Sequence, residues 1–191
     1  DQTLFPPRPL EEEPFGLKRP IFMTVSRIAV EKNLPAFLDL DLPGSKVVVG
    51  DGPEREALQR RYPDVLFTGM KTGEDLAHAY AQADVFVFPS KTDTFGNTIL
   101  EALASGVPVA AFPVTGPVDI IEEGSDAGAL NDDLRQACLD ALTCPRENAR
   151  RLARNFTWEA ASKQFLNNVL IAQGKKALPG RKRNFRAALP S

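Results

Sequence analysis

Histidine and cysteine are scarce in this sequence of 191 residues, which contains one histidine, His78, and two cysteines, Cys138 and Cys144. Structural zinc sites and disulfide scaffolds need these residues at defined spacings, and the sequence has no CxxC motif and no His/Cys cluster. A single histidine inside an amphipathic segment also excludes serine–histidine and histidine–metal chemistry within the chain. The low cysteine content fits a reducing compartment, and we expect a cytoplasmic protein.

Long apolar runs are missing as well, because no stretch of about 18 apolar residues occurs. The formal net charge of −2 gives no indication of a nucleic-acid partner. The charge is uneven, however, since residues 172–191 contain basic residues and no acidic one. We expect residues 174–191 to form a flexible basic tail. It is either simply solvated or in peripheral contact with the inner face of a membrane or with a polysaccharide.

The chain opens on DQTLFPPRPLEEEPFG, a segment rich in proline and acidic residues, and it has no initiator methionine. This composition resembles that of a linker between domains. We therefore expect residues 1–20 to be the remnant of an interdomain linker, and the chain to be a fragment of a longer protein.

Short apolar runs alternate with helix-period segments through most of the chain. The apolar runs predict strands buried on both faces at 21–25, 46–49, 65–67, 85–88 and 108–112. The segments between them predict helices at 33–40, 53–62, 73–83 and 96–105, and further helices follow at 117–122, 132–142, 146–155 and 157–173. This alternation predicts an α/β fold with a Rossmann-like open parallel sheet and helices on both faces. We assign the domain to residues 21–156.

Ligands of open α/β sheets bind at the carboxyl ends of the strands. The segments that follow the predicted strands are 26–32, 50–53, 68–71 and 89–97, and they concentrate glycine and charged residues. We therefore expect the functional site at this edge of the sheet.

Two of these segments allow both a binding and a structural interpretation. Arg27 and Lys32 follow the first strand and could clamp a diphosphate, the arginine as a fork and the lysine as a point charge. The alternative is a pair of solvated surface charges.

The turn GDGP at 50–53 lacks the spacing of a phosphate-binding loop. A tight turn before a helix explains its sequence, and close approach of a ligand to Gly50 or Gly52 is the other interpretation.

The segment TDTFGNTILE at 92–101 predicts a helix that begins near Gly96 and directs its free N–H groups into the crevice, which is a favourable place for an anion. Glu101 leans back toward the helix start and could accept hydrogen bonds from ribose hydroxyls, while Asp93 could be a helix cap or a second acceptor. The alternative is a capped amphipathic helix with a solvated polar stripe. That stripe comprises Thr94, Asn97, Thr98, Glu101 and Ser105.

Asp39-Leu40-Asp41 has the form of the DxD metal motif of some sugar transferases. It lies at the predicted end of a helix, just before Pro43-Gly44, so we interpret it as a surface turn on the edge away from the crevice.

The combination of motifs resembles the retaining nucleotide-sugar glycosyltransferases of the GT-B type, family 4. The segments that carry the resemblance are SRIAVEKN, GDGP, VLFTG, AYAQADVFVFPS, TDTFGNTILEALASGVPVAA and FTWEAASKQF, between about residues 21 and 168. They match the C-terminal, donor-binding half of such enzymes. The resemblance therefore implies a partner, the N-terminal acceptor-binding domain, which has no counterpart in this chain.

The resemblance also implies roles for individual residues. Arg27 and Lys32 would hold the donor diphosphate, and Asp93 stands in place of the first glutamate of the family's E-x7-E motif, which contacts the sugar. These are the implied catalytic residues. Glu101 matches the second glutamate, which binds the ribose. The other implied donor-binding residues are Gly50, Gly52, Gly69, Met70, Lys71, Thr94, Phe95, Gly96 and Asn97. The helix 157–173 would brace the missing domain.

The implied activity is transfer of a hexose from a UDP- or GDP-sugar with retention at the anomeric carbon, without a metal, in bacterial-type glycan or glycolipid biosynthesis. We expect the fragment alone to bind nucleotide weakly and to be inactive. Two alternatives remain at this stage. One is a stand-alone nucleotide- or nucleotide-sugar-binding module, and the other is half of a sugar-nucleotide 2-epimerase.

Overall fold

The computed structural model describes residues 5–6, 8–92, 96–121 and 124–156. Residues Asp1–Arg154 form one compact unit. The predicted bracing helix at 157–173 and the basic tail at 174–191 lie outside the described residues. Within the described ranges, no helix is long and apolar enough to cross a membrane.

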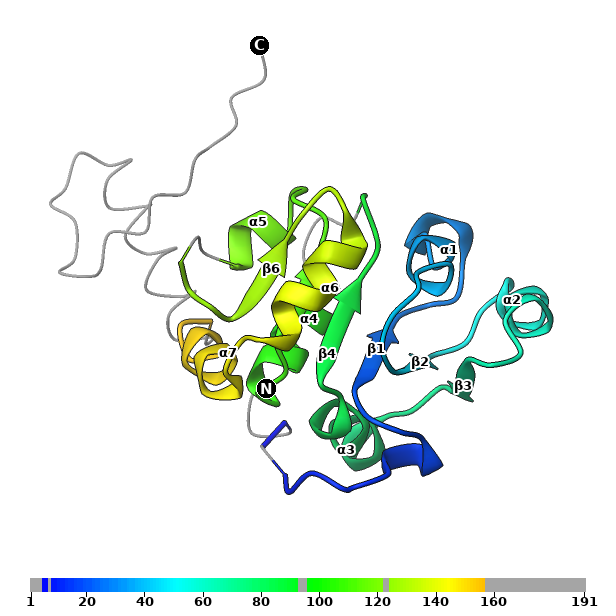
Figure 1. Ribbon diagram of the computed structural model, residues 1–191, viewed down its shortest axis with the longest axis horizontal. Coiled ribbons are helices and arrows are strands. Elements are labelled where there is room, and N and C mark those ends of the chain that lie inside the picture. The colour runs from blue at the N-terminus through cyan, green and yellow to red at the C-terminus, as the bar shows by residue number, and fades with distance from the viewer. Residues whose placement is uncertain (1–4, 7, 93–95, 122–123, 157–191) are drawn as a thin grey trace, which may run out of the picture. The chain divides into compact units, whose positions relative to one another are not determined.

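A six-stranded parallel sheet forms the centre of this unit, with the strand order β3-β2-β1-β4-β5-β6 (Figure 1). The strands are β1 (Ile21–Val25), β2 (Ser45–Val49), β3 (Leu66–Gly69), β4 (Val85–Phe88), β5 (Val109–Ala111) and β6 (Gly128–Leu130). The predicted fold class and the five predicted strands are confirmed. The sixth strand escaped prediction because Gly-Ala-Leu has no β-branched or aromatic residue. Gly128 is needed there, since a Cβ at this position would lie 2.3 Å from the Val109 carbonyl oxygen of β5.

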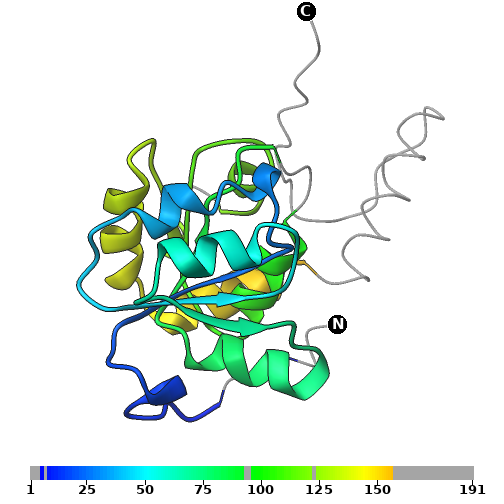
Figure 2. The same ribbon diagram turned by 90° about the vertical axis from the view of Figure 1, so that its right-hand side faces the viewer.

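Helices cover both faces of the sheet. They are α1 (Pro35–Leu38), α2 (Arg55–Arg61), α3 (Gly73–Gln82), α4 (Asn97–Ala104), α5 (Pro117–Ile120), α6 (Leu134–Leu142) and α7 (Arg146–Ala153), with the short 3-10 helices η2 (Pro14–Gly16) and η3 (Val30–Lys32). The first two connections and α6 pack on one face, and α3, α4 and α7 pack on the other (Figures 1 and 2). The segment predicted as a helix at 33–40 is shorter, because Pro35 begins α1 and the preceding turn is η3.

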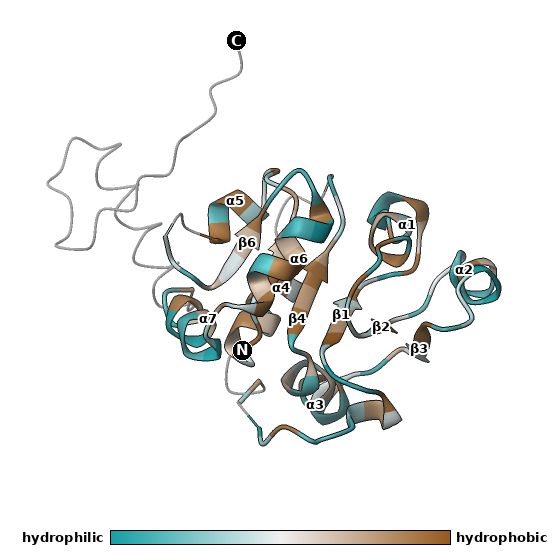
Figure 3. Cartoon of the chain, viewed as in Figure 1, coloured by the Kyte–Doolittle hydropathy of each residue, from teal (hydrophilic) through white to brown (hydrophobic). Residues whose placement is uncertain are grey.

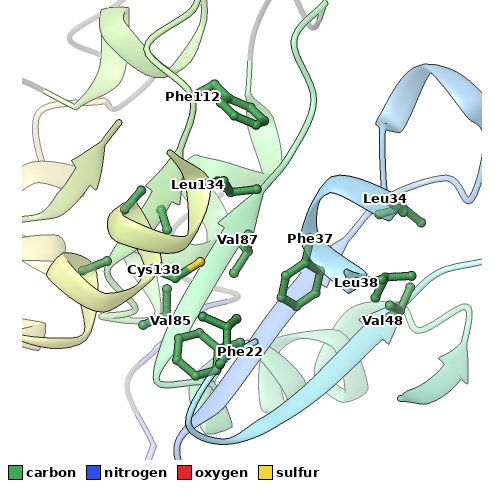
Figure 4. Close-up of a cluster of buried hydrophobic side chains, with 14 of the residues drawn as sticks. Phe22, Leu34, Phe37, Leu38, Val48, Val85, Val87, Phe112, Leu134 and Cys138 are labelled. Atoms are coloured by element: carbon green, nitrogen blue, oxygen red, sulfur yellow. The ribbon is translucent and has the colours of Figure 1, made fainter. Parts of the chain in front are cut away.

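Apolar side chains between the sheet and the first of these helical layers form a continuous core. Figure 4 shows Phe22 of β1 and Val85 of β4 among the side chains of α1 and α6, including Phe37 and Cys138. Burial raises the pKa of the Cys138 thiol to about 12, so this cysteine serves as a small apolar residue. Polar residues lie mainly on the outer helices such as α2 (Figure 3).

The amino edge of the sheet carries a closed polar cluster, which we call the amino-edge cluster and define as Arg19, Gln82, Asp84 and Arg146. Arg19 Nη1 donates to both carboxylate oxygens of Asp84 at 2.7 Å, and Arg19 Nη2 donates to Gln82 Oε1 at 3.2 Å. Asp84 Oδ2 also accepts from the backbone N–H of Ile21 at 2.7 Å. The cluster therefore fixes the start of β1 against the start of β4.

Arg146 connects α7 to the ends of two other helices. Its guanidinium donates to the carbonyl oxygens of Ala83 at 2.6 Å, Ala81 at 2.9 Å and Ser105 at 3.4 Å. These carbonyls belong to the C-terminal ends of α3 and α4, where backbone acceptors lack partners within the helix. One half-buried cation thus donates hydrogen bonds at two helix ends.

The described part of the predicted linker, up to residue 20, lies along α3. Arg8 forms an ion pair with Glu74, and Gln82 Nε2 donates to the Pro9 carbonyl oxygen at 2.9 Å. Phe5 packs edge-on against the ring of Tyr80, with 5.5 Å between the ring centroids. This segment is therefore packed onto the domain through side chains and backbone.

Candidate functional site

A cavity of about 280 Å³ opens at the carboxyl ends of β1 and β4. The chain runs outward from β1 to β3 and then returns to begin β4 on the other side of β1, so the cavity lies where the strand order reverses. Its walls come from the end of β1 with the following loop, from the end of β4, and from the start of α4. The lining residues are Thr24, Val25, Ser26, Arg27, Lys32, Phe88, Pro89, Ser90, Gly96, Asn97 and Thr98.

The loop after β1 brings two cations to this cavity. Arg27 is exposed, Lys32 is partly buried at the end of η3, and both line the cavity. Asn33 follows in a left-handed conformation (φ 53°), and its Nδ2 donates to the Pro89 carbonyl oxygen at 3.0 Å. This bond holds the loop after β1 against the loop after β4, so that both loops line the same cavity as the start of α4.

The GDGP turn supports this loop from behind. A Cβ on Gly50 would lie 1.9 Å from the Ser26 carbonyl oxygen, and a Cβ on Gly52 would lie 2.3 Å from that of Ile28. The backbone N–H of Ile28 donates to the Asp51 carbonyl oxygen at 2.9 Å. The glycines thus let two backbone segments approach closely, as the structural interpretation requires, and neither of them lines the cavity.

The start of α4 forms the third wall. Gly96 is the N-cap, and Asn97 and Thr98 are the first two helical residues, whose N–H groups have no acceptor within the helix. No side chain caps this end among the described residues. The positive end of the helix dipole therefore faces the cavity beside Arg27 and Lys32, and the three together favour a bound anion.

Glu101 lies one helical turn behind this wall. Its Oε2 accepts a hydrogen bond from Tyr80 Oη of α3 at 2.9 Å. Burial raises the pKa of the Glu101 carboxyl, and the hydrogen bond from Tyr80 partly opposes that shift. Burial also raises the pKa of Tyr80, so its hydroxyl remains a donor. Tyr80 was not predicted, although a buried tyrosine hydroxyl needs a partner and an acid in a facing helix is a natural one.

The polar stripe predicted on α4 is only partly solvated. Asn97 is exposed and Thr98 is half-buried, but Ser105 is completely buried, and its Oγ has no hydrogen-bond partner among the described residues. The alternative of a solvated stripe therefore fails at Ser105, because Arg146 of α7 contacts the end of α4 there. The predicted site residues Asp93, Thr94 and Phe95 lie outside the described residues.

The remaining predicted donor-binding residues follow β3 at the same sheet edge. Gly69 ends that strand with φ 79°, Met70 is exposed, and Lys71 is half-buried. None of the three lines the cavity. Sequence reasoning did not assign the other lining residues to the site, and among them the polar Thr24, Ser26 and Ser90 had no signal except their place near the ends of strands.

The DxD-like segment is a surface turn, as predicted. Asp39 ends α1, is exposed, and accepts a hydrogen bond from Tyr62 Oη at 2.6 Å. It precedes β2 and therefore lies on the amino edge, away from the cavity. Across the described part of the chain, no group of three or more His, Cys, Asp or Glu residues could hold a metal ion.

Comparison with known proteins places these features in a family. Residues 19–144 match the family described as glycosyl transferases group 1. A GDP-mannose-dependent α-mannosyltransferase of Corynebacterium glutamicum is 37% identical over 169 residues, which are 82% of this chain and 40% of that protein. A sulfoquinovosyl transferase of Arabidopsis thaliana is 34% identical over 81% of this chain and 34% of its own length. The chain therefore spans less than half of these relatives.

Solved structures agree with the fold. Sucrose-phosphate synthase from Thermosynechococcus elongatus has a TM-score of 0.70 at 26% identity, covering 91% of this chain and 51% of that one. HepE of Anabaena, solved in complex with UDP, has a TM-score of 0.70 at 19% identity, covering 90% of this chain and 55% of that one. With a parallel sheet, a cationic cavity at its switch point and a family match over most of the domain, this chain belongs to the group 1 glycosyltransferases.

Proposed function

We propose that the chain is the C-terminal, donor-binding half of a family-4 GT-B glycosyltransferase that transfers a hexose from a nucleoside-diphosphate sugar with retention. The observation that carries this proposal is the cavity at the end of β1, where Arg27, Lys32 and the N-terminal end of α4 converge. A diphosphate is the anion that best fits two cations and a helix N-terminus.

The same arrangement suits the chemistry of the reaction. As the bond between sugar and diphosphate breaks, negative charge grows on the leaving diphosphate. Preorganised cations and helix N–H groups stabilise this charge more in the transition state than in the ground state. Arg27 can hold two phosphate oxygens with its planar fork, while Lys32 acts as a point charge. We propose that these groups do so without a metal ion.

The relatives and structural neighbours indicate which donors to test. The relatives named above include a GDP-mannose-dependent enzyme, and HepE was solved with UDP. We propose a GDP- or UDP-hexose, with GDP-mannose as the first donor to test. The segment 93–97 would contact the sugar and distal phosphate, Glu101 the ribose, and the loop 69–71 the base.

The chain would act only with an acceptor-binding domain. Since it spans about 40% of the mannosyltransferase relative, we propose that an N-terminal domain of the longer protein supplies the acceptor site. The isolated chain should then bind donor but transfer no sugar. We also propose that the protein acts in the cytoplasm, where its basic tail contacts a membrane or a polysaccharide.

Isothermal titration of the 191-residue chain with GDP, UDP and GDP-mannose tests the site. We expect binding of one nucleotide, and a loss of about tenfold or more in affinity for Arg27→Ala, because a charge-assisted contact is removed. Arg60→Ala is the matched control, since Arg60 is an exposed arginine of α2 outside the cavity lining.

Two results would contradict the proposal. The site assignment fails if none of the three ligands binds, or if Arg27→Ala behaves like Arg60→Ala. Sugar transfer by the purified chain with no added domain would show that the acceptor half is not required.

A further inference from the structure

The hydroxyl of Tyr80 is buried between α3 and α4 and reaches one acceptor. The Tyr80 side chain is fully buried, with Phe5 against one side and Phe86 of β4 within 5.6 Å of its ring centroid. Its Oη donates to Glu101 Oε2 at 2.9 Å. The ring packing leaves the hydroxyl little freedom, so the direction of this bond is set by the core.

The bond occupies only one of the two oxygens of Glu101. Within the described part of the chain, no donor is found for Oε1. Glu101 is half-buried, and it lies on the helical face that carries Asn97 and Thr98, the two α4 residues that line the cavity. Among the described residues, the carboxylate is therefore bonded at one oxygen only, one helical turn from the wall of the cavity.

Packing alone does not account for an acid at this position. Burial opposes the charged form of Glu101, as the raised pKa of its carboxyl shows. A neutral amide oxygen would also accept a hydrogen bond from the Tyr80 hydroxyl and would avoid the cost of desolvating a charge. A charged acceptor gains most when a second hydroxyl donates to Oε1, because charge-assisted hydrogen bonds are stronger than neutral ones.

We propose that Tyr80 is a positioning residue that fixes Glu101 so that the free carboxylate oxygen accepts a hydrogen bond from a ribose hydroxyl of the bound nucleotide. This inference rests on the proposed function. A free glutamate has several rotatable bonds, and ordering them on binding would weaken affinity. Tyr80 orders the side chain in advance, and it does so from α3, a helix that contributes no residue to the cavity wall.

The test compares GDP with 2′,3′-dideoxy-GDP, which keeps base and diphosphate but lacks both hydroxyls. Isothermal titration of the 191-residue chain should show tighter binding of GDP. In Tyr80→Phe, GDP binding should weaken by about fivefold while dideoxy-GDP binding stays unchanged. Replacement of Tyr80 by 4-aminophenylalanine, which restores a donor at the same place, should restore the preference.

Tyr62→Phe is the matched control. Tyr62 is the other tyrosine of the chain, and its hydroxyl also donates to a carboxylate, Asp39, at 2.6 Å. It lies outside the cavity lining, so both ligands should bind this variant as they bind the parent chain. In the double variant Tyr80→Phe with Glu101→Gln, the loss should not exceed that of Glu101→Gln alone, because the two residues act as a unit.

The outcomes separate this inference from the proposed function. If the parent chain prefers GDP and Tyr80→Phe keeps the full preference, or loses affinity for both ligands equally, the role of Tyr80 is refuted. The ratio of the two affinities is unaffected by a partly unfolded sample, since both ligands meet the same folded fraction. If neither GDP nor the corresponding UDP pair binds the parent chain, the proposed function itself fails.

Discussion

The two edges of the sheet both carry arginines, but they use them differently. At the amino edge, Arg19 and Arg146 are half-buried and donate hydrogen bonds to Asp84, Gln82 and backbone carbonyls. At the carboxyl edge, Arg27 is exposed beside a cavity and forms no ion pair with any described residue. A cation that is already bonded within the chain stabilises the fold, whereas one held open beside a cavity is available to a ligand.

This contrast also separates stability from function along one sheet. The amino-edge cluster joins β1 to β4, and the cavity lies at the other end of the same two strands. Changes at the first edge should therefore affect unfolding, and changes at the second should affect binding. Natural proteins commonly give up some stability at their binding sites and recover it elsewhere.

The largest expected effect comes from Asp84→Ala. It leaves the Arg19 guanidinium without its carboxylate in a site where both side chains are about one-fifth exposed. We expect the free energy of unfolding to fall by about 3 kcal/mol, measured by urea denaturation. The affinity for GDP should stay within about twofold, and a large loss of affinity in the folded variant would show that the two edges are coupled.

Gly52→Ala should lower both the stability of the fold and the affinity for GDP. The added Cβ would lie 2.3 Å from the Ile28 carbonyl oxygen, so the loop that carries Arg27 has to move. We expect a loss of about 2 kcal/mol in unfolding free energy together with weaker GDP binding. Gly128→Ala is the control, because its Cβ would lie 2.3 Å from the Val109 carbonyl oxygen in β5, outside the cavity lining. Equal losses of GDP affinity in both variants would contradict this account.

The smallest effect concerns pH. Because burial raises the pKa of Glu101 above its ordinary value of 4.5, the folded protein takes up this proton before the unfolded chain does. Relative to Glu101→Gln, the free energy of unfolding of the parent chain should therefore increase as the pH falls from the raised pKa of Glu101 toward 4.5. Over the same window the parent chain should lose affinity for GDP-mannose. Titrations at several pH values measure the binding effect, and an equal pH dependence in Glu101→Gln would rule out this carboxyl as its source.

Much of this comparison could be anticipated from the sequence at the carboxyl edge. Apolar runs at 21–25 and 85–88 located the strands, and topology alone predicted that Arg27, Lys32 and Gly96 would meet. The amino edge offered no such signal. Arg19 and Asp84 lie 65 positions apart and become partners only through the pairing of β1 with β4.

Side-chain contacts between neighbouring helices could not be predicted from the sequence either. Tyr80 and Glu101 belong to α3 and α4, and their hydrogen bond depends on the distance and rotation of the two helices, which hydrophobic periodicity does not determine. The sixth strand was missed for a related reason. Its three residues are half-buried and none is β-branched or aromatic, so its place in the sheet is decided by pairing with β5 and not by its own composition.

The guanidinium of Arg146 has a consequence for how this domain should be cut. The family match ends at residue 144, just before the helix that carries this arginine. A protein shortened to the matched region would leave the carbonyls of Ala81, Ala83 and Ser105 without this donor, at the ends of the helices that hold Tyr80 and Glu101. The shortest fragment that keeps α3 and α4 in place around the site therefore extends through α7, beyond the end of the family match at residue 144.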